Sequence, residues 1–162
     1  MQLWQWGLRG LLVVALAVVS SVPSAARADE EEDPFYEGFF SGYFIYLRQA
    51  DLSVGIFSDA ALKDVYDKDT SLTVAKMHAG GAAGVEKELT KIAKSDAVEK
   101  EDAAVIKKMA VVAGLVKKQA ETLHALLEGD KSQAAAFTEA RGETSKVLAA
   151  LEKDLKEYLS EE

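Results

Sequence analysis

The sequence predicts an all-α protein, an antiparallel up-down-up-down four-helix bundle that follows a cleaved signal peptide. Beyond residue 33 the chain is rich in Ala, Leu, Val, Lys and Glu and contains one proline, Pro34, a composition typical of long helices. Apolar residues recur there at helical spacing in four stretches. Short polar turns separate these stretches, so consecutive helices should be antiparallel neighbours in one bundle domain, residues 34–162.

Residues 1–28 have the layout of an export signal. A basic residue, Arg9, precedes an apolar run at residues 11–19. Ala26 and Ala28 supply the small residues that signal peptidase accepts, so we expect cleavage after Ala28, with cleavage after Ala26 as the alternative. The apolar run is shorter than the roughly 20 residues that a membrane-spanning helix needs. The sequence predicts an exported protein, periplasmic or extracellular, with no transmembrane span in the mature chain.

The mature chain is strongly acidic. Removal of residues 1–28 moves the formal charge from −8 to −10, because Arg9 and Arg27 are lost and no acidic residue is. A protein of this charge, with no basic stripe, repels the phosphates of nucleic acids and the surfaces of anionic membranes. We therefore expect no nucleic acid partner. Cysteine is absent, so the core alone must hold the fold without disulfides.

The first helix is predicted over residues 34–66, after an acidic tail at residues 29–33. Asp33 can cap its N-terminus, and Pro34 suits the first helical position, where no N–H is needed. A break near Ser58 is the alternative to one continuous helix. The predicted core stripe is Tyr36, Phe40, Tyr43, Leu47, Ala50, Val54, Phe57 and Ala61.

The other three helices are predicted over residues 70–95, 97–128 and 131–160. Gly129 should end the third helix, because glycine readily adopts the left-handed conformation found at helix C-termini. Asp130 should cap the fourth helix. The second core stripe is Val74, Ala75, His78, Ala82, Val85, Leu89 and Ile92, the third is Val98, Val105, Ile106, Met109, Val112, Ala113, Val116, Ala120, Leu123 and Leu127, and the fourth is Phe137, Thr144, Leu148, Leu151, Leu155 and Tyr158.

The start of the first helix is more aromatic than a bundle requires. Large apolar side chains cover nearly its whole circumference, whereas one core stripe needs about half of them. One interpretation packs them into the end of the bundle, against Tyr158. The functional interpretation is an exposed patch that binds a second copy, another exported protein or a membrane surface, with close contact permitted at Gly38 and Gly42. The predicted contact residues are Phe35, Phe39, Phe40, Tyr43, Phe44 and Tyr46.

Glycines gather at the middle level of the predicted bundle, although each glycine inside a helix costs about 1 kcal/mol relative to alanine. One explanation is that small residues let the helices approach closely around Phe57. The alternative is a mid-bundle cavity that carries a small apolar ligand or cofactor, with His78 as a hydrogen-bonding or axial group. The predicted lining is Gly55, His78, Gly81, Gly84 and Gly114.

Metal and catalytic chemistry have little support in the sequence. Glu121 and His124 form half of the di-iron bundle motif, but the second half is missing. The candidate for a loosely held divalent ion is a cluster of Asp67, Asp69, Glu121 and His124 at one bundle end. No nucleophile lies beside a histidine and an orienting acid. We therefore expect no enzyme, no bound metal and no cofactor, but a binding or structural module, with the apolar-ligand carrier as the alternative.

Overall fold

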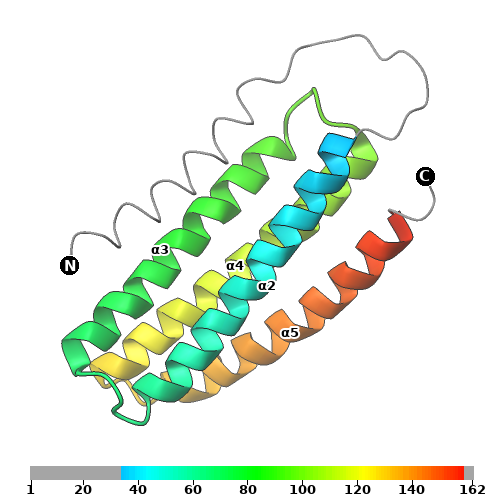
Figure 1. Ribbon diagram of the computed structural model, residues 1–162. Coiled ribbons are helices and arrows are strands. Elements are labelled where there is room, and N and C mark those ends of the chain that lie inside the picture. The colour runs from blue at the N-terminus through cyan, green and yellow to red at the C-terminus, as the bar shows by residue number, and fades with distance from the viewer. Residues whose placement is uncertain (1–33, 159–162) are drawn as a thin grey trace. The chain divides into compact units, whose positions relative to one another are not determined.

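The computed structural model describes residues 34–158, with side chains from residue 38 onward. The described chain is all-helical and contains no strand, as predicted (Figure 1). Its four helices are α2 (Pro34–Ala61), α3 (Lys68–Ile92), α4 (Lys100–Glu128) and α5 (Gln133–Tyr158), and they belong to one compact unit. The predicted signal peptide and acidic tail, residues 1–33, lie outside the described residues.

The four helices alternate in direction along the bundle, as Figure 1 shows. Helix α4 contacts each of the other three, and α2 also contacts α3 and α5, whereas α3 and α5 are not in contact within the described bundle. The cross-section is therefore a rhombus in which α2 and α4 lie across the short diagonal. No helix in residues 34–158 combines the length and apolar character that a membrane span requires.

Helix α2 ends at Ala61, short of the predicted residue 66. The N–H of Asp64 donates to the carbonyl of Ala61 at 3.2 Å, and the N–H of Val65 donates to that of Ala60 at 3.1 Å. These two bonds form a Schellman motif, in which the residue after the cap is left-handed. Asp64 is that residue, with φ of 55°. The sequence did not reveal this end because the left-handed position holds an aspartate instead of a glycine.

The predicted alternative, a break near Ser58, is wrong, because the helix runs through that position. The Ser58 hydroxyl donates to the carbonyl of Gly55 at 2.7 Å, which satisfies this buried group within the helix. Helix α3 then begins after Asp67, whose carboxylate accepts from the N–H of Thr70 at 2.8 Å. The hydrogen bonds from Thr70 hold the pKa of Asp67 below its usual value.

Helix α4 begins at Lys100, later than the predicted residue 97, because residues 95–98 form a turn closed by the Val98 N–H on the Ser95 carbonyl. At its other end Gly129 adopts φ of 116° and closes a second Schellman motif, so the predicted end is confirmed. Asp130 accepts from the N–H and hydroxyl of Ser132 before α5 begins. These bonds, with one from Gln133, lower the pKa of Asp130.

The core lies along α4, whose buried residues span more than half of its circumference. Ala113 and Ala120, both fully buried, lie near the middle of this arc and leave room for α2 to pack closely. The predicted stripes supply most of the core. Its large fully buried side chains are Phe40, Leu47, Val54, Leu89, Ile106, Met109, Val112, Val116, Leu123 and Leu151.

One buried amide links three helices. The Gln119 Nε2 of α4 donates to the Asp51 carboxylate of α2 at 2.8 Å and to the Thr144 hydroxyl of α5 at 2.6 Å. Thr144 in turn donates to the carbonyl of Ala140 at 2.8 Å. The Gln119 Oε1 is buried without a hydrogen-bond partner. An unsatisfied buried acceptor costs about 1–3 kcal/mol. The network therefore favours this arrangement of the helices over other arrangements, but it reduces the total stability of the folded protein.

We expect Gln119→Glu to destabilise the bundle by about 3 kcal/mol at neutral pH, because it places a buried carboxylate against Asp51. Burial and the neighbouring charge should raise the pKa of the introduced carboxyl above its unfolded value. The loss of stability in this variant should therefore be complete above that raised pKa and should become smaller as the pH falls through it. Urea unfolding at several pH values measures this, with the uncharged Gln119→Met as the control. Equal losses in both variants at every pH would contradict the account.

The two left-handed helix ends predict opposite effects of glycine. Asp64→Gly should stabilise the protein by about 0.5 kcal/mol, because glycine removes the steric cost of positive φ. Gly129→Ala should destabilise it by about 1 kcal/mol, because it introduces that cost. Thermal unfolding of both variants checks the pair. A destabilised Asp64→Gly variant would show that the aspartate side chain itself stabilises this turn.

Candidate interaction surface

The structure corrects one predicted contact residue, Phe40, which is fully buried. Its ring packs edge-to-face against Tyr158 with a centroid distance of 5.4 Å, and the hydroxyl of Tyr158 donates to the buried carboxylate of Asp102. Phe40 also belongs to the predicted core stripe, and that assignment is the correct one. The side chain of Phe35 lies outside the described residues.

The other predicted aromatic residues of α2 are only partly accessible. Phe39, Tyr43 and Phe44 are half-buried and pack against the core. Burial, and next the charge of Glu88, raises the pKa of Tyr43 above its usual value. Tyr46 is 43% exposed, and burial of the remainder raises its pKa as well. These four rings therefore lie at the border between core and surface.

The exposed apolar residues of α2 are mainly aliphatic. Ile45, Leu52 and Ile56 are 54%, 55% and 72% exposed. Their spacing of seven and four residues places them on one side of the helix. Gly38 and Gly42 lie on the same side, and a Cβ atom built on either would meet nothing within 4 Å. This side of the helix is therefore open and has glycines at one end and aliphatic side chains at the other.

This side of α2 also lacks charge. We call it the outer α2 face and define it by six residues, Gly38, Gly42, Ile45, Gln49, Leu52 and Ile56. The charged residues of α2 that border it, Arg48 and Asp59, are exposed and pair with α5, where Arg48 lies 4.0 Å from Glu152 and Asp59 lies 3.3 Å from Arg141. The solvent-facing side of a bundle helix is normally charged or polar, so an uncharged face with three exposed aliphatic residues needs a separate explanation.

The outer α2 face was missed at the sequence level, although a signal for it exists. The positions of Ile45, Leu52 and Ile56 do not belong to the core stripe of the first helix. Apolar residues that recur at helical spacing outside the stripe predict a second apolar side. The dense aromatic residues around them hid that pattern.

The predicted cavity residues do not converge. Gly81 and Gly84 lie on the exposed surface of α3, where an added Cβ would meet nothing within 4 Å. A Cβ on Gly55 would lie 3.0 Å from Nη2 of Arg141, and one on Gly114 would lie 3.0 Å from Oε1 of Glu86. Two of the glycines thus make room for side chains of neighbouring helices, and the other two face outward.

His78, the fifth predicted cavity residue, is half-buried beside Phe57, with a ring-centroid distance of 6.0 Å. Burial lowers its pKa below the usual value. Phe57 also stacks on Tyr66, at 6.0 Å, so His78 borders a small aromatic group between α2 and α3. The neutral imidazole packs there as a partly apolar ring.

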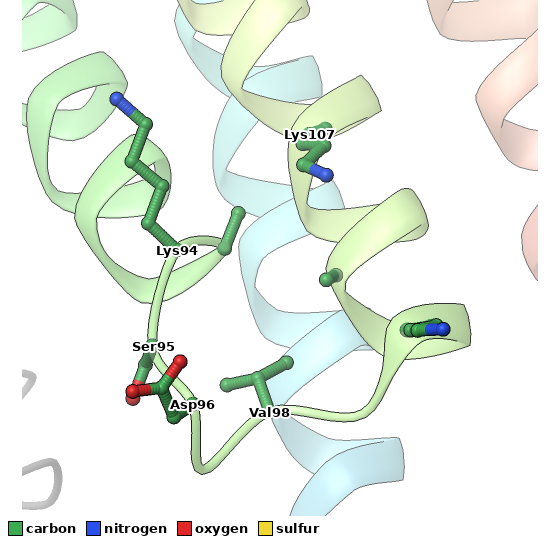
Figure 2. A pocket seen from close by; sticks show the side chains of 8 residues that line it. Lys94, Ser95, Asp96, Val98 and Lys107 are labelled. Atoms are coloured by element: carbon green, nitrogen blue, oxygen red, sulfur yellow. The ribbon is translucent and has the colours of Figure 1, made fainter.

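A solvent-open hollow of about 600 Å³ lies where α3 turns into α4 (Figure 2). Lysines line part of it, but Lys94 extends away from the turn that carries Asp96 and Val98, as Figure 2 shows. A smaller hollow of about 260 Å³ adjoins it between the same helices. Neither hollow is lined by His78 or by a predicted cavity glycine, so they do not supply the predicted ligand cavity.

The predicted metal cluster does not assemble. Within residues 34–158 no group of three or more histidine and carboxylate side chains is placed to hold a metal ion. The Asp67 carboxylate caps α3, and Nδ1 of His124 lies 3.5 Å from the Glu128 carboxylate in its own helix. Asp69 belongs to the first turn of α3 and Glu121 is exposed on α4. The contacts described for Asp67 and His124 are thus with residues close to them in the chain.

Comparison of the chain with protein-family models, with curated protein sequences and with solved structures gave no match. The arrangement of the described residues is therefore the basis for a functional proposal.

His78 should make the stability depend on pH. Its folded pKa lies below the value of 6.5 that it has when unfolded, so the unfolded state binds the proton more readily. The contribution of the neutral His78 ring to stability is complete above the pKa of the unfolded state. It decreases as the pH falls towards the pKa of the folded state. Thermal unfolding between about pH 7.5 and 5 should show this decline. His78→Phe should flatten it, and an unchanged slope in this variant would contradict the assignment.

Proposed function

We propose that this chain is an exported, non-catalytic helical-bundle protein that acts as an interaction module, and that the outer α2 face is its contact surface. The observation that carries the proposal is the alignment of Ile45, Leu52 and Ile56, each more than half exposed, on a face without charge. This contact surface replaces the aromatic one expected from the sequence, of which Tyr46 remains at the border.

The alignment of its aliphatic residues and the absence of charge distinguish the outer α2 face from ordinary exposed residues. Single exposed aliphatic residues are common on proteins and need no explanation. A row of them on an uncharged face, bordered by ion pairs such as Arg48–Glu152 and Asp59–Arg141, has the anatomy of an interface with an apolar centre and a polar rim. Full burial of an exposed large aliphatic side chain contributes about 1.5–3 kcal/mol, and these three, each more than half exposed, would gain the corresponding part of it in a complex.

The export part of the proposal rests on residues 1–28. The apolar run, the small residues before Asp29 and the basic residue near the N-terminus together support cleavage after Ala28. The module would then act in the periplasm or outside the cell. A net negative charge would keep it from binding nucleic acids and anionic membranes without specificity, so the uncharged face would determine the choice of partner.

A photo-crosslinking residue tests the proposal in the native cell. Placed at Ile56, it should give covalent adducts of discrete mass in protein recovered from the export compartment. The same residue at Val111, which is 55% exposed on α4, is the matched control and should give none. The intact mass of the uncrosslinked protein should show that residues 1–28 are missing.

Equal crosslinking at both positions, or none at Ile56, would exclude the outer α2 face as the contact surface. A retained N-terminus would exclude cleavage. A small apolar molecule that copurifies with the protein would instead favour the carrier function, in which case the adducts at Ile56 should be absent.

A further inference from the structure

We propose that the partner of the outer α2 face is a second copy of this chain, bound with the two α2 helices antiparallel and with Gln49 of each copy at the two-fold axis. The inference rests on the proposed function, because it names the partner of the same surface. Three features of the described residues support it, namely the order of small and large side chains along α2, the exposed glycines of α3 and the distribution of charge.

The order of residues on the outer α2 face is complementary to itself when reversed. In an antiparallel pair with Gln49 opposite Gln49, Gly42 of one copy lies opposite Ile56 of the other. Ile45 lies beside Leu52 of the other copy in the same register. Each of these contacts occurs twice, as two-fold symmetry requires. The exposed Ile56 side chains therefore fit against open glycine backbone, and the one central polar residue can hydrogen-bond its own copy through its amide.

A parallel pair has no such fit. It would place Gly42 opposite Gly42 and Ile56 opposite Ile56, so that the helices would be close at one end and held apart at the other. Helices pack at nearly constant interaxial distances of about 8–10 Å. The antiparallel register therefore matches the surface better along its whole length.

The exposed glycines of α3 lie at the level of the proposed axis. Phe57 of α2 contacts His78 of α3, and the charge of Glu88 acts on Tyr43. Gln49, midway between Tyr43 and Phe57, is therefore level with the α3 segment between His78 and Glu88. That segment contains the exposed residues Gly80, Gly81 and Gly84, at each of which an added Cβ would meet nothing within 4 Å in the described residues.

Two-fold symmetry brings the same α3 edge of both copies to one side of the α2 pair. Glycines there would let these edges approach without side-chain clashes, which accounts for residues that each cost a single bundle about 1 kcal/mol. Met77, which is 54% exposed on the same helix, would be covered as well. The glycines thus gain a role in the dimer that they lack in one copy.

Charge favours the same arrangement. Two copies of a chain with formal charge −8 before processing repel each other, so they can meet closely only where both surfaces are uncharged. The outer α2 face is such a surface. At its α5 edge, close to the axis, each copy contributes Arg48 and Glu152, which lie 4.0 Å apart. Opposite charges in equal number at this edge permit exchange of ion pairs between the copies.

The size of the surface indicates a weak dimer. The distance from Gly38 to Ile56 is about 27 Å along the helix, and one helix pair with its α3 edges falls in the smallest class of interfaces, below about 1,200 Å² in total. We expect half of the protein to be dimeric at a concentration on the order of 10–100 μM.

Single cysteines test the register, because the chain has no cysteine of its own. In the mature protein at about 100 μM, Gln49→Cys should form a disulfide-linked dimer under mild oxidation. Gly42→Cys and Ile56→Cys should not do so alone, because each would lie roughly 20 Å from its own copy, beyond the ~7 Å Cα separation that a disulfide tolerates. A mixture of these two variants should form the mixed disulfide.

The controls separate the outcomes. Val111→Cys, at an exposed position of α4, measures random collision. Crosslinking of Gln49→Cys no faster than this control would overturn the proposal, and equal homodimer formation at positions 42, 49 and 56 would overturn the antiparallel register. Sedimentation of the cysteine-free protein provides an independent readout, in which Ile56→Lys should weaken dimerisation at least tenfold and Val111→Lys should not change it.

Failure of the dimer can be distinguished from failure of the proposed function. If Gln49→Cys does not crosslink while the photo-crosslinker at Ile56 gives adducts whose mass differs from that of two copies, the face binds a different protein and only the present inference fails. If neither position gives an adduct, both fail.

Discussion

The packing of α4 against three helices determines the rest of the structure. Its buried arc covers more than half of the circumference, and the fully buried Ala113 and Ala120 near the centre of that arc let α2 lie close to it. Because α2 and α4 occupy the short diagonal, α3 and α5 remain out of contact within the described bundle. Helix α2 therefore has its inner side in the core, its flanks against α3 and α5, and its outer side free. The apolar outer side is exposed as a direct consequence of this arrangement.

Gln119 makes this arrangement specific. Apolar contacts along long helices tolerate axial sliding, since one aliphatic residue can replace another at small cost. The amide of Gln119 reaches both Asp51 and Thr144 only at one axial position of α2 and α5. The unpartnered Oε1 shows that the network is not optimised for stability. Its contribution is to hold Asp51, and with it Gln49 two residues earlier, at one level relative to α4 and α5.

Much of the fold follows from the sequence, because helical periodicity identifies core stripes wherever polar residues separate them. Each predicted stripe supplies residues of the buried core, among them Val54, Leu89, Met109 and Leu151. Helix ends were less accurate, since they depend on backbone conformation: Gly129 was identified by its residue type, whereas the left-handed Asp64 was not. In the aromatic segment of α2, helical periodicity could not separate core from surface residues, for a physical reason. When apolar residues surround a helix, periodicity alone assigns the same residue to the core and to an exposed patch. Phe40 received both assignments, and its packing shows that it belongs to the core.

The glycines at the middle level of the bundle also could not be assigned to the inside or the outside from the sequence. Sequence position grouped Gly55, Gly81, Gly84 and Gly114 at one level of the bundle, but a level does not specify a side. In the structure Gly55 and Gly114 face side chains of neighbouring helices, while Gly81 and Gly84 face open space. An inward glycine is explained by the bundle itself, because a larger side chain would displace its neighbour. An outward glycine inside a helix has no such explanation in one copy. In the proposed dimer a second copy would approach the outward glycines of α3, which are level with the uncharged outer α2 face.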